Sequence, residues 1–368
     1  MDSDAIVYCC ALSKVFAYKC AAGRHLAEAF GGPAGVFAAR RDELTAVLSQ
    51  ADAYVDQLLD PALLEWARRE TDWARAHGIR LLPLGEPDYP QRLAECEDAP
   101  LMLYYKGTVS LNGPRILAVV GTRKATWYGR ETVRRIISRL ADLEVKPLIV
   151  SGLALGIDGC AHAAALECGL ETVGVLPCGI DEIYPRQHQE LALRMAGQGA
   201  LLTDFPRSTA PVAFTFLRRN RIIAGLADAT LLAESYRKGG GLITVSLAES
   251  YNREIFAVPG RLTDNSFEGC NHLIAKQTAM PIADADTLPS ALGWLDVTAR
   301  RKRPSPIRPD DPPMRRECLR LLQARGALSV EELAAQMRIE SRQASVLLLE
   351  LEMEGRVKSD GTDFFLTL

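Results

Sequence analysis

RILAVVGTRKAT at residues 115–126 and PLIVSGLALGID at 147–158 decide the fold class of this chain. Each is a short apolar run that ends in a loop with glycine, and a longer amphipathic stretch follows. Similar runs continue along the chain as TVGVLP, ALLTDF, DATLLAES, EIFAVPG and AMPI, between residues 172 and 282. Short apolar strands that alternate with amphipathic helices build parallel sheets. The region from about Arg115 to Trp294 therefore predicts an α/β, Rossmann-like, doubly wound, mostly parallel sheet.

The residues before this region have a different pattern. From Ser3 to about Arg80 apolar residues recur at helical spacing, with a Gly-Gly-Pro turn at 31–33. This predicts a helical domain over residues 1–83, of the SAM or helix-hairpin-helix-like kind. GEPDYPQRL at 85–93 then predicts a connector, and LMLYYKG at 101–107 a short docked strand. We place the Rossmann-like domain at residues 84–297.

The residues after the sheet predict a linker and a third domain. Proline and charge dominate ARRKRPSPIRPDDPP at 299–313, which predicts a basic linker over 298–313. Its Arg300–Arg303 stretch fits a solvated linker or an accessory DNA contact equally well. The remaining residues, 314–368, predict a winged helix-turn-helix. The expected elements are helices at 314–325, 330–337 and 341–353, with Ser329 capping the second, and a hairpin at 356–367.

Composition limits the possible functions. The formal net charge is −3, so nucleic-acid binding has to rest on local clusters of arginine and lysine. No stretch approaches the roughly 20 apolar residues of a membrane span, and the N-terminus is acidic where a signal peptide is basic. We therefore expect a cytoplasmic protein without membrane contact. The nine cysteines include no CxxC pair, which supports neither a disulfide framework nor a zinc site.

The residues just after the predicted strands suit an anion. Ligands of open α/β sheets bind at the carboxyl ends of the strands, where helix N-termini present free N–H groups. Gly121, Thr122, Arg123 and Lys124 follow the first strand, ahead of a helix expected to begin near Gly129.

A second loop follows the next strand. Ser151 is followed by Gly152 and Gly156, which lack the Cβ atoms that would keep a phosphate from the backbone. Asp158 then suits the N-cap of the next helix.

Two further loops carry most of the cations. FTFLRRNR at 214–221 places three arginines and two aromatic residues at the start of a helix over IIAGLA, and YRKGGG at 236–241 adds two cations and three glycines. Four such loops on one edge fit a ligand with several consecutive phosphates, which means a strand of nucleic acid. The predicted DNA-binding residues are Gly121, Thr122, Arg123, Ser151, Gly152, Phe216, Arg218, Arg219, Asn220, Arg221, Lys238 and Gly240.

Other functional readings of these residues are weaker. The chain has neither the G-x-G-x-x-G of a dinucleotide site nor a Walker A loop. His162 and His188 have no neighbouring nucleophile, and Asp158, Asp181 and Asp204 each follow a strand, where capping or a turn explains them. We expect no catalytic residue, no metal and no cofactor.

The motifs resemble the DNA-processing protein A family, also called DprA or Smf. They stand here as Gly121-Thr122-Arg123, SGLALGID at 151–158, CGIDEIYP at 178–185, FLRRNRIIAG at 216–225 and GGLIT at 240–244, with FAVPGR and EGCNHLIAK further on. The similarity spans roughly Leu84 to Ile282. Thr122 replaces the usual serine, Leu217 replaces a proline, and Gly240 stands where the family often has serine.

The resemblance implies a function and partners. Members of this family bind single-stranded DNA, load the RecA recombinase onto it during natural transformation, and typically form dimers. The resemblance implies that this chain protects incoming DNA, forms a homodimer through the Rossmann-like domain and has no enzymatic activity. Carried over by motif, Arg123, Arg219, Asn220, Arg221 and Lys238 are the expected contacts.

Two rival functions remain open. The first is a nucleotide hydrolase of the lysine-decarboxylase-like group, whose P-G-G-x-G-T-x-x-E loop is absent here. The second is a transcription regulator led by the winged helix. Its predicted recognition helix is acidic, which favours a protein partner or a weak contact over duplex DNA.

Overall fold

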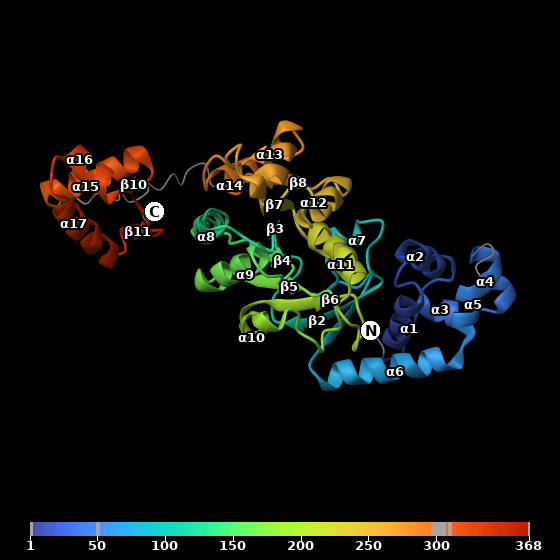
Figure 1. The fold of residues 1–368 in the computed structure, drawn as a ribbon. Helices are drawn as coiled ribbons and strands as arrows, with labels where there is room; N and C mark the ends of the chain where they lie inside the picture. Colours follow the sequence, from blue (N-terminus) through green and yellow to red (C-terminus); the bar gives the residue numbers. More distant parts are fainter. Residues whose placement is uncertain (1–2, 49–51, 296–306, 308–310, 367–368) are drawn as a thin grey trace. The chain divides into compact units, whose positions relative to one another are not determined.

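The computed structural model describes residues 3–48, 52–295, 307 and 311–366. The chain divides into two compact units, residues 1–295 and residues 296–368 (Figure 1). The first unit contains a group of N-terminal helices and a large sheet, and the second contains a small sheet with three helices.

In the part of the chain that the structure describes, six helices precede the sheet. They pack around Leu12, Phe16, Leu26 and Leu44, all of which are almost fully buried. Asp60 caps the longest of them, because its carboxylate accepts a hydrogen bond from the Ala62 amide at 2.9 Å. The helices are α1 (Ser3–Val15), α2 (Cys20–Ala29), α3 (Pro33–Ala38), α4 (Arg41–Leu48), α5 (Asp52–Leu59) and α6 (Pro61–Ala76).

The large sheet has nine strands in the order β1-β2-β6-β5-β4-β3-β7-β8-β9. Only the β1–β2 and β2–β6 pairs are antiparallel, so the predicted fold class is confirmed. The strands are β1 (Arg80–Pro83), β2 (Met102–Gly107), β3 (Ile116–Gly121), β4 (Leu148–Ser151), β5 (Thr172–Val175), β6 (Ala200–Thr203), β7 (Ala229–Glu234), β8 (Glu254–Ala257) and β9 (Met280–Pro281).

The first strand corrects the sequence analysis. Residues 80–83 were assigned to the helical domain, but they form an edge strand that pairs with β2. Four residues are too few to establish an alternating pattern, so the sequence holds little signal for this strand.

Helices cover both faces of the sheet. α8, α9 and α10 follow β3, β4 and β5 on one face, and α11 and α12 lie on the other (Figure 1). The helices of this region are α7 (Gln91–Ala94), α8 (Trp127–Ala141), α9 (Ile157–Glu167), α10 (Gln189–Gln198), α11 (Ala213–Leu226), α12 (Gly241–Ser250), α13 (Glu268–Ala275) and α14 (Thr287–Ala291), with 3-10 turns η1 (Arg186–His188) and η2 (Asn265–Phe267).

The second unit is a winged helix. Its elements are α15 (Pro313–Arg325), β10 (Leu328–Ser329), α16 (Val330–Met337), α17 (Ser341–Met353), β11 (Val357–Ser359) and β12 (Asp363–Leu366). The predicted cap is confirmed, because Ser329 accepts from the Glu332 amide at 3.2 Å and Glu332 accepts from the Ser329 amide at 3.0 Å. The basic stretch Arg300–Arg303 of the predicted linker lies outside the described residues.

Within the described ranges, no helix has the length and apolar composition that a membrane crossing requires.

Candidate nucleic-acid interface

The candidate site lies where the strand order reverses. From β3 the chain first adds β4, β5 and β6 on one side and then returns to add β7 on the other. Ligands of doubly wound sheets bind in the crevice at this switch point. Two hydrogen bonds join the surrounding loops. The Thr122 amide donates to the Glu234 carbonyl at 2.8 Å, and the Ile157 amide donates to the Thr122 carbonyl at 3.1 Å.

The loop after β3 presents two cations. Arg123 and Lys124 are both exposed, and Thr126 caps α8 by accepting a hydrogen bond from the Gly129 amide at 3.1 Å. The helix begins at Trp127, close to the expected start near Gly129. The cations stand directly before a helix N-terminus, which is a favourable place for a phosphate.

Glu234, which sequence analysis missed, holds this loop in place. Its carboxylate is fully buried and accepts from the amide and the hydroxyl of Thr126 at 2.9 and 3.0 Å. A Cβ atom at Gly129 would lie 2.1 Å from that carboxylate, so only glycine fits there. Glu234 ends an otherwise apolar strand, and an acidic residue in a buried run was the signal that could have revealed it.

An aromatic and cationic group sits beside the loop. The Arg123 guanidinium lies over the Phe216 ring of α11, 4.9 Å from its centroid. The Phe216 ring meets the Tyr184 ring edge-on, with centroids 5.4 Å apart. Three segments that are distant in sequence therefore meet here. The sequence prediction included Arg123 and Phe216 but missed Tyr184, whose position in the CGIDEIYP motif after β5 was the available signal.

Arg219 is buried under the switch-point edge of the sheet. Only 3% of its surface is exposed, and its guanidinium donates to the carbonyls of Gly152, at 2.5 Å, and Val175. Asn220 accepts a further bond from its Nε at 3.2 Å. Burial lowers the pKa of Arg219 to about 10, against the opposing effect of Asp158, so the group stays charged at neutral pH. Arg219 therefore fixes the ends of β4 and β5.

The glycines serve internal packing. A Cβ atom at Gly152 would lie 2.3–2.5 Å from the Arg219 guanidinium. Gly156 has a φ of +82°, and its Cβ would lie 2.2 Å from the Thr122 carbonyl oxygen. A Cβ at Gly121 would meet the Ile157 side chain at 2.6 Å. The sequence analysis assigned Gly152 and Gly156 to the approach of a phosphate, but other parts of the protein occupy the space at both.

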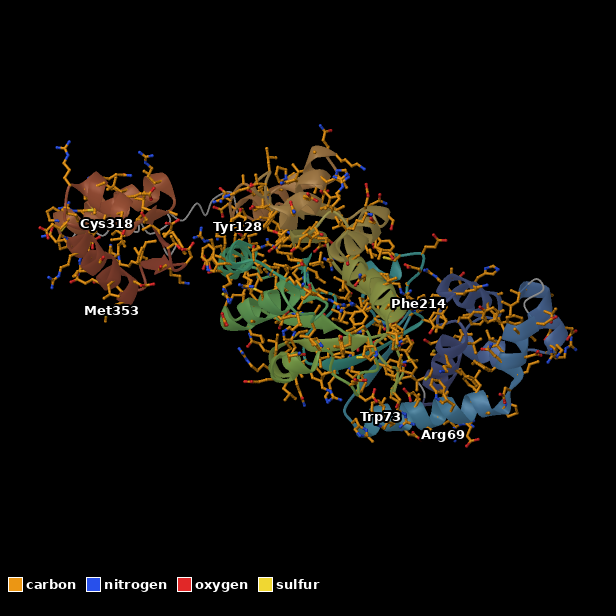
Figure 2. The ribbon with its side chains drawn as sticks, in the orientation of Figure 1. Arg69, Trp73, Tyr128, Phe214, Cys318 and Met353 are labelled. Carbon is orange, nitrogen blue, oxygen red and sulfur yellow. The ribbon has the colours of Figure 1, made fainter. Side chains whose placement is uncertain are left out.

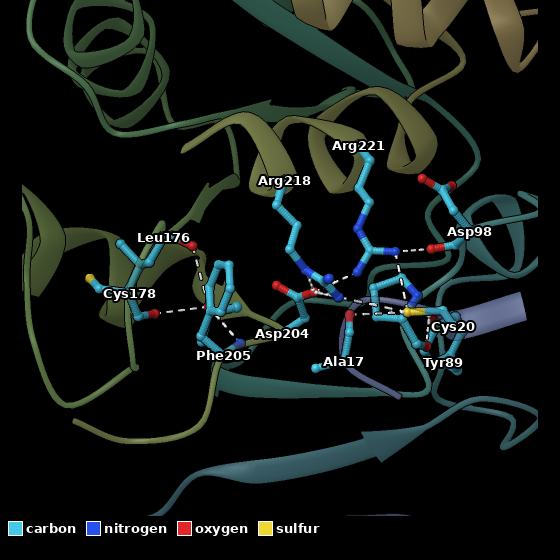
Figure 3. Close-up of polar contacts among 12 residues, drawn as sticks. Ala17, Cys20, Tyr89, Asp98, Leu176, Cys178, Asp204, Phe205, Arg218 and Arg221 are labelled. Atoms are coloured by element: carbon cyan, nitrogen blue, oxygen red, sulfur yellow. Dashed lines mark hydrogen bonds and ion pairs between the residues drawn. The ribbon is translucent and has the colours of Figure 1, made fainter. Parts of the chain in front are cut away.

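Arg218 and Arg221 both point toward Asp204 and the Cys20 sulfur (Figure 3). Arg221 and Arg218 lie 2.5 and 3.3 Å from one carboxylate oxygen of Asp204, and Arg221 also donates to the Asp98 carbonyl. Both guanidinium groups contact the Cys20 sulfur of α2, at 3.6 and 3.7 Å. Burial alone would lower the pKa of Arg221, but Asp204, Cys20 and Asp98 together raise it. These arginines tie α11 to the N-terminal helices.

This arrangement corrects the predicted start of the helix. The sequence placed the arginines at the beginning of a helix over residues 222–227, whereas α11 already begins at Ala213. The arginines therefore lie in its middle, where successive side chains point to different sides. Arg218 and Arg221 consequently face the N-terminal helices, while Arg219 faces the sheet.

The remaining predicted residues differ in exposure. Lys238 is exposed in the loop after β7, next to the exposed Arg237. Gly240 has open space around the position of a Cβ. Ser151 is fully buried, and its hydroxyl donates to the Val119 carbonyl at 2.5 Å, so it joins two strands.

The acidic residues have structural partners. Asp158 does not cap α9 as expected, because Gly156 holds the N-cap position and Asp158 accepts from the Gly152 amide at 3.1 Å. Burial raises the pKa of Asp158. Asp204 forms ion pairs in place of the expected cap or turn, and Asp181 accepts from the Ser208 amide at 2.9 Å.

The two histidines also have structural partners. His162 is fully buried beside Thr172, whose hydroxyl donates to the Ile149 carbonyl at 3.0 Å. The His162 Nδ1 therefore donates to that hydroxyl, at 2.7 Å. His188 contacts the Leu153 carbonyl through Nδ1 at 2.8 Å.

Comparison with known families adds an independent finding. The family model described as DNA recombination-mediator protein A matches residues 80–293. A second model, described as the DprA winged helix domain, matches residues 302–361. The two matches together cover well over half of the chain.

Individual relatives agree with these matches. The chain is 38% identical over 200 residues to the DNA processing protein DprA of Streptococcus pneumoniae, covering 54% of this chain and 70% of the relative. It is 32% identical over 308 residues to the protein Smf of Synechocystis, covering 75% and 77%.

Solved structures show the same similarity. The X-ray structure of DprA from Streptococcus pneumoniae superposes with a TM-score of 0.57 and 32% identity, over 68% of this chain and 90% of that one. DNA processing protein A from Helicobacter pylori, solved for its single-stranded DNA binding mode, gives a TM-score of 0.53 and 29% identity, over 58% and 95%.

The Rossmann-like sheet, its cationic switch-point edge and the winged helix define a class of DNA-processing proteins. Within that class the chain belongs to the DprA/Smf family. The resemblance inferred from the sequence motifs is thereby confirmed.

Proposed function

We propose that this protein binds single-stranded DNA along the switch-point edge of its sheet, protects it there, and loads the RecA recombinase onto it without catalysing a reaction itself. One observation carries the proposal. Arg123 lies over the half-buried ring of Phe216, directly before the N-terminus of α8. Such a group offers a cation and a helix N-terminus to a phosphate and an aromatic ring to a base.

The residues of the edge take different roles in this proposal. Arg123, Lys124 and Lys238 are exposed and contact phosphates. Phe216 and Tyr184 form the surface on which a base stacks. Arg219 is a positioning residue, because its buried guanidinium holds the ends of β4 and β5 that shape the edge. Arg218 and Arg221, which were predicted to contact DNA, instead hold α11 in place through Asp204 and the Cys20 sulfur.

The relatives support this proposal. The Helicobacter pylori protein binds single-stranded DNA, and the present chain aligns with 95% of that structure. Family membership is the basis for RecA loading and for a homodimer through the Rossmann-like domain. A pairwise binding assay with RecA and sedimentation equilibrium would test these two partners separately.

Two arginines test the proposal. Arg123→Ala removes an exposed cation, so single-strand affinity should fall about tenfold while the free energy of unfolding changes by less than about 0.5 kcal/mol. Arg219→Ala removes a buried, hydrogen-bonded cation, so affinity and stability should both fall, the latter by about 2–4 kcal/mol. Fluorescence anisotropy and urea denaturation measure the two effects.

Two further measurements provide a control and test the rival function. Duplex DNA of equal length should compete poorly for the labelled single strand. Unchanged affinity in Arg123→Ala would contradict the proposal. Release of free base from a nucleoside monophosphate would instead favour the nucleotide hydrolase considered above.

A further inference from the structure

Exposed apolar side chains gather away from the switch-point edge, where the turn between α1 and α2 meets α11. Tyr18 is 65% exposed, Phe214 is 54% exposed and Leu217 is 48% exposed. Figure 2 shows Phe214 at the side of α11 that faces the N-terminal helices. We call these three residues the Tyr18 face. Exposed apolar clusters of this kind mark surfaces that bind a partner.

The two aromatic rings are held in place. The centroids of Tyr18 and Phe214 lie 5.4 Å apart, with the ring planes tilted by 51°. The Arg218 guanidinium lies over the Tyr18 ring, 4.7 Å from its centroid, and is itself fixed by Asp204 at 3.3 Å. A partner that contacts Tyr18 therefore meets a ring whose orientation is already set, which lowers the entropy cost of binding.

Charge around the Tyr18 face favours a polyanion. Lys19, the residue next to Tyr18, is exposed, and its ammonium group lies over the Tyr54 ring, 5.3 Å from the centroid. Two acidic groups close to α11 are engaged inside the protein, since Asp204 pairs with the arginines of α11 and Asp98 accepts from the Tyr251 hydroxyl at 2.6 Å. Exposed aromatic rings beside lysines are the features that proteins use to hold single strands.

The face is connected to the candidate site through α11. Phe214 and Phe216 lie two residues apart on α11, and because of the helical repeat they point to different sides. Phe216 faces Arg123 at the switch-point edge, whereas Phe214 faces Tyr18. One helix thus carries an aromatic residue toward each of the two surfaces.

We propose that the Tyr18 face is a second stacking site, which extends the path of single-stranded DNA from the sheet edge onto the N-terminal helices. The inference rests on the proposed function, because it assigns a further part of the same strand. It predicts that the N-terminal helices contribute to binding only when the strand is long enough to reach them.

Oligothymidylates of increasing length, from about 6 to about 30 nucleotides, test this site. In the variant Tyr18→Ala/Phe214→Ala, affinity for the longest strands should fall about tenfold, while affinity for the shortest strands stays at the parent value. The dependence of affinity on salt should not change, because the variant removes no phosphate contact. In the parent, strands that contain 5-iodouracil should crosslink to Tyr18 or Phe214 on irradiation.

Matched variants keep the outcome interpretable. Leu193→Ala removes an apolar side chain of α10 that is 69% exposed, and it should bind every length like the parent. Tyr18→Trp keeps a stacking ring and should preserve the length effect. Should the double variant be poorly folded, Tyr18→Ala alone should show the same loss for long strands only.

The two proposals fail in different ways. A parent that binds no single strand of any length overturns the proposed function. The second site alone is overturned if the parent binds single strands, the double variant binds every length as tightly as the parent does, and the parent gives no crosslinks at Tyr18 or Phe214. The Tyr18 face would then be a surface for a protein partner.

Discussion

Gly152 helps to shape the candidate site, because it leaves room for the buried Arg219 guanidinium that holds the strand ends. The sequence analysis explained this glycine by the approach of a phosphate, whereas its missing Cβ makes room for the Arg219 guanidinium. A glycine between a strand and a helix has the same appearance in sequence in both cases. The identity of the atom that fills the space depends on α11, which begins more than 60 residues further along the chain.

Gly152→Ala tests this explanation. The guanidinium can make room for a Cβ only by giving up its bonds to the Gly152 and Val175 carbonyls. We therefore expect the free energy of unfolding to fall by about 1–3 kcal/mol and single-strand affinity to fall with it. Gly197→Ala is the control, because nothing lies within 4 Å of its Cβ position on α10. Its stability should stay constant or rise by up to about 1 kcal/mol in urea denaturation. Equal tolerance of alanine at both positions would refute the packing role.

The buried His162 should make the free energy of unfolding depend on pH. Burial, followed by His188 and Arg219, lowers its pKa to about 3 from an ordinary value near 6.5. Between these values the unfolded chain binds a proton that the folded chain does not, so stability falls as the pH drops below about 6.5. His162→Gln removes this contribution.

The measurement compares urea denaturation of the parent and His162→Gln between about pH 6.5 and 5, above the range in which most carboxylates titrate. The parent should lose up to about 1.4 kcal/mol per pH unit more than the variant. Parallel pH profiles would show that His162 can be protonated in the folded protein.

At the scale of elements, α11 connects the candidate interface to the N-terminal helices. The sequence analysis found the FTFLRRNR motif but placed the arginines at a helix start. Because the three arginines stand close together at the end of the motif, the sequence does not show which arginine faces which neighbour. That assignment depends on Asp204 and Cys20, which lie in other elements.

Asp204 provides the test at this scale. Its carboxylate is buried and pairs with Arg221 and Arg218, so Asp204→Ala leaves two cations without their partner. We expect a loss of about 3–5 kcal/mol in the free energy of unfolding. Glu65→Ala breaks the exposed Glu65–Arg69 pair of α6 and should cost less than about 1 kcal/mol. Similar melting temperatures for the two variants would contradict the role of Asp204 as a tie.

Most of the elements could be predicted from the sequence, because short apolar runs and amphipathic stretches follow the periods of strands and helices. The strands from β3 to β9 and the three helices of the winged unit are found where the patterns indicated. β1 was missed because it is only four residues long. Glu234 and Tyr184 were missed because their importance comes from contacts across the sheet edge.

For the whole molecule, the central question is how a chain with a net charge of −3 would hold a polyanion. The structure offers a local answer. Its switch-point edge carries exposed Arg123, Lys124 and Lys238, while Asp158, Asp204 and Glu234 are buried. Exposed cations act on a nearby phosphate at short range, whereas distant surface charges are screened by salt.

The most direct measurement of the central claim is the salt dependence of single-strand binding. We would measure the affinity of the parent and of Arg123→Ala/Lys238→Ala for a labelled oligonucleotide between about 50 and about 200 mM salt. The parent should bind more weakly as salt rises, and the variant should bind more weakly throughout. Its slope of log affinity against log salt should be smaller by about 1.4, as expected for two lost phosphate contacts. A parent that does not bind, or a variant with the affinity and slope of the parent, would contradict the assignment of this edge to single-stranded DNA.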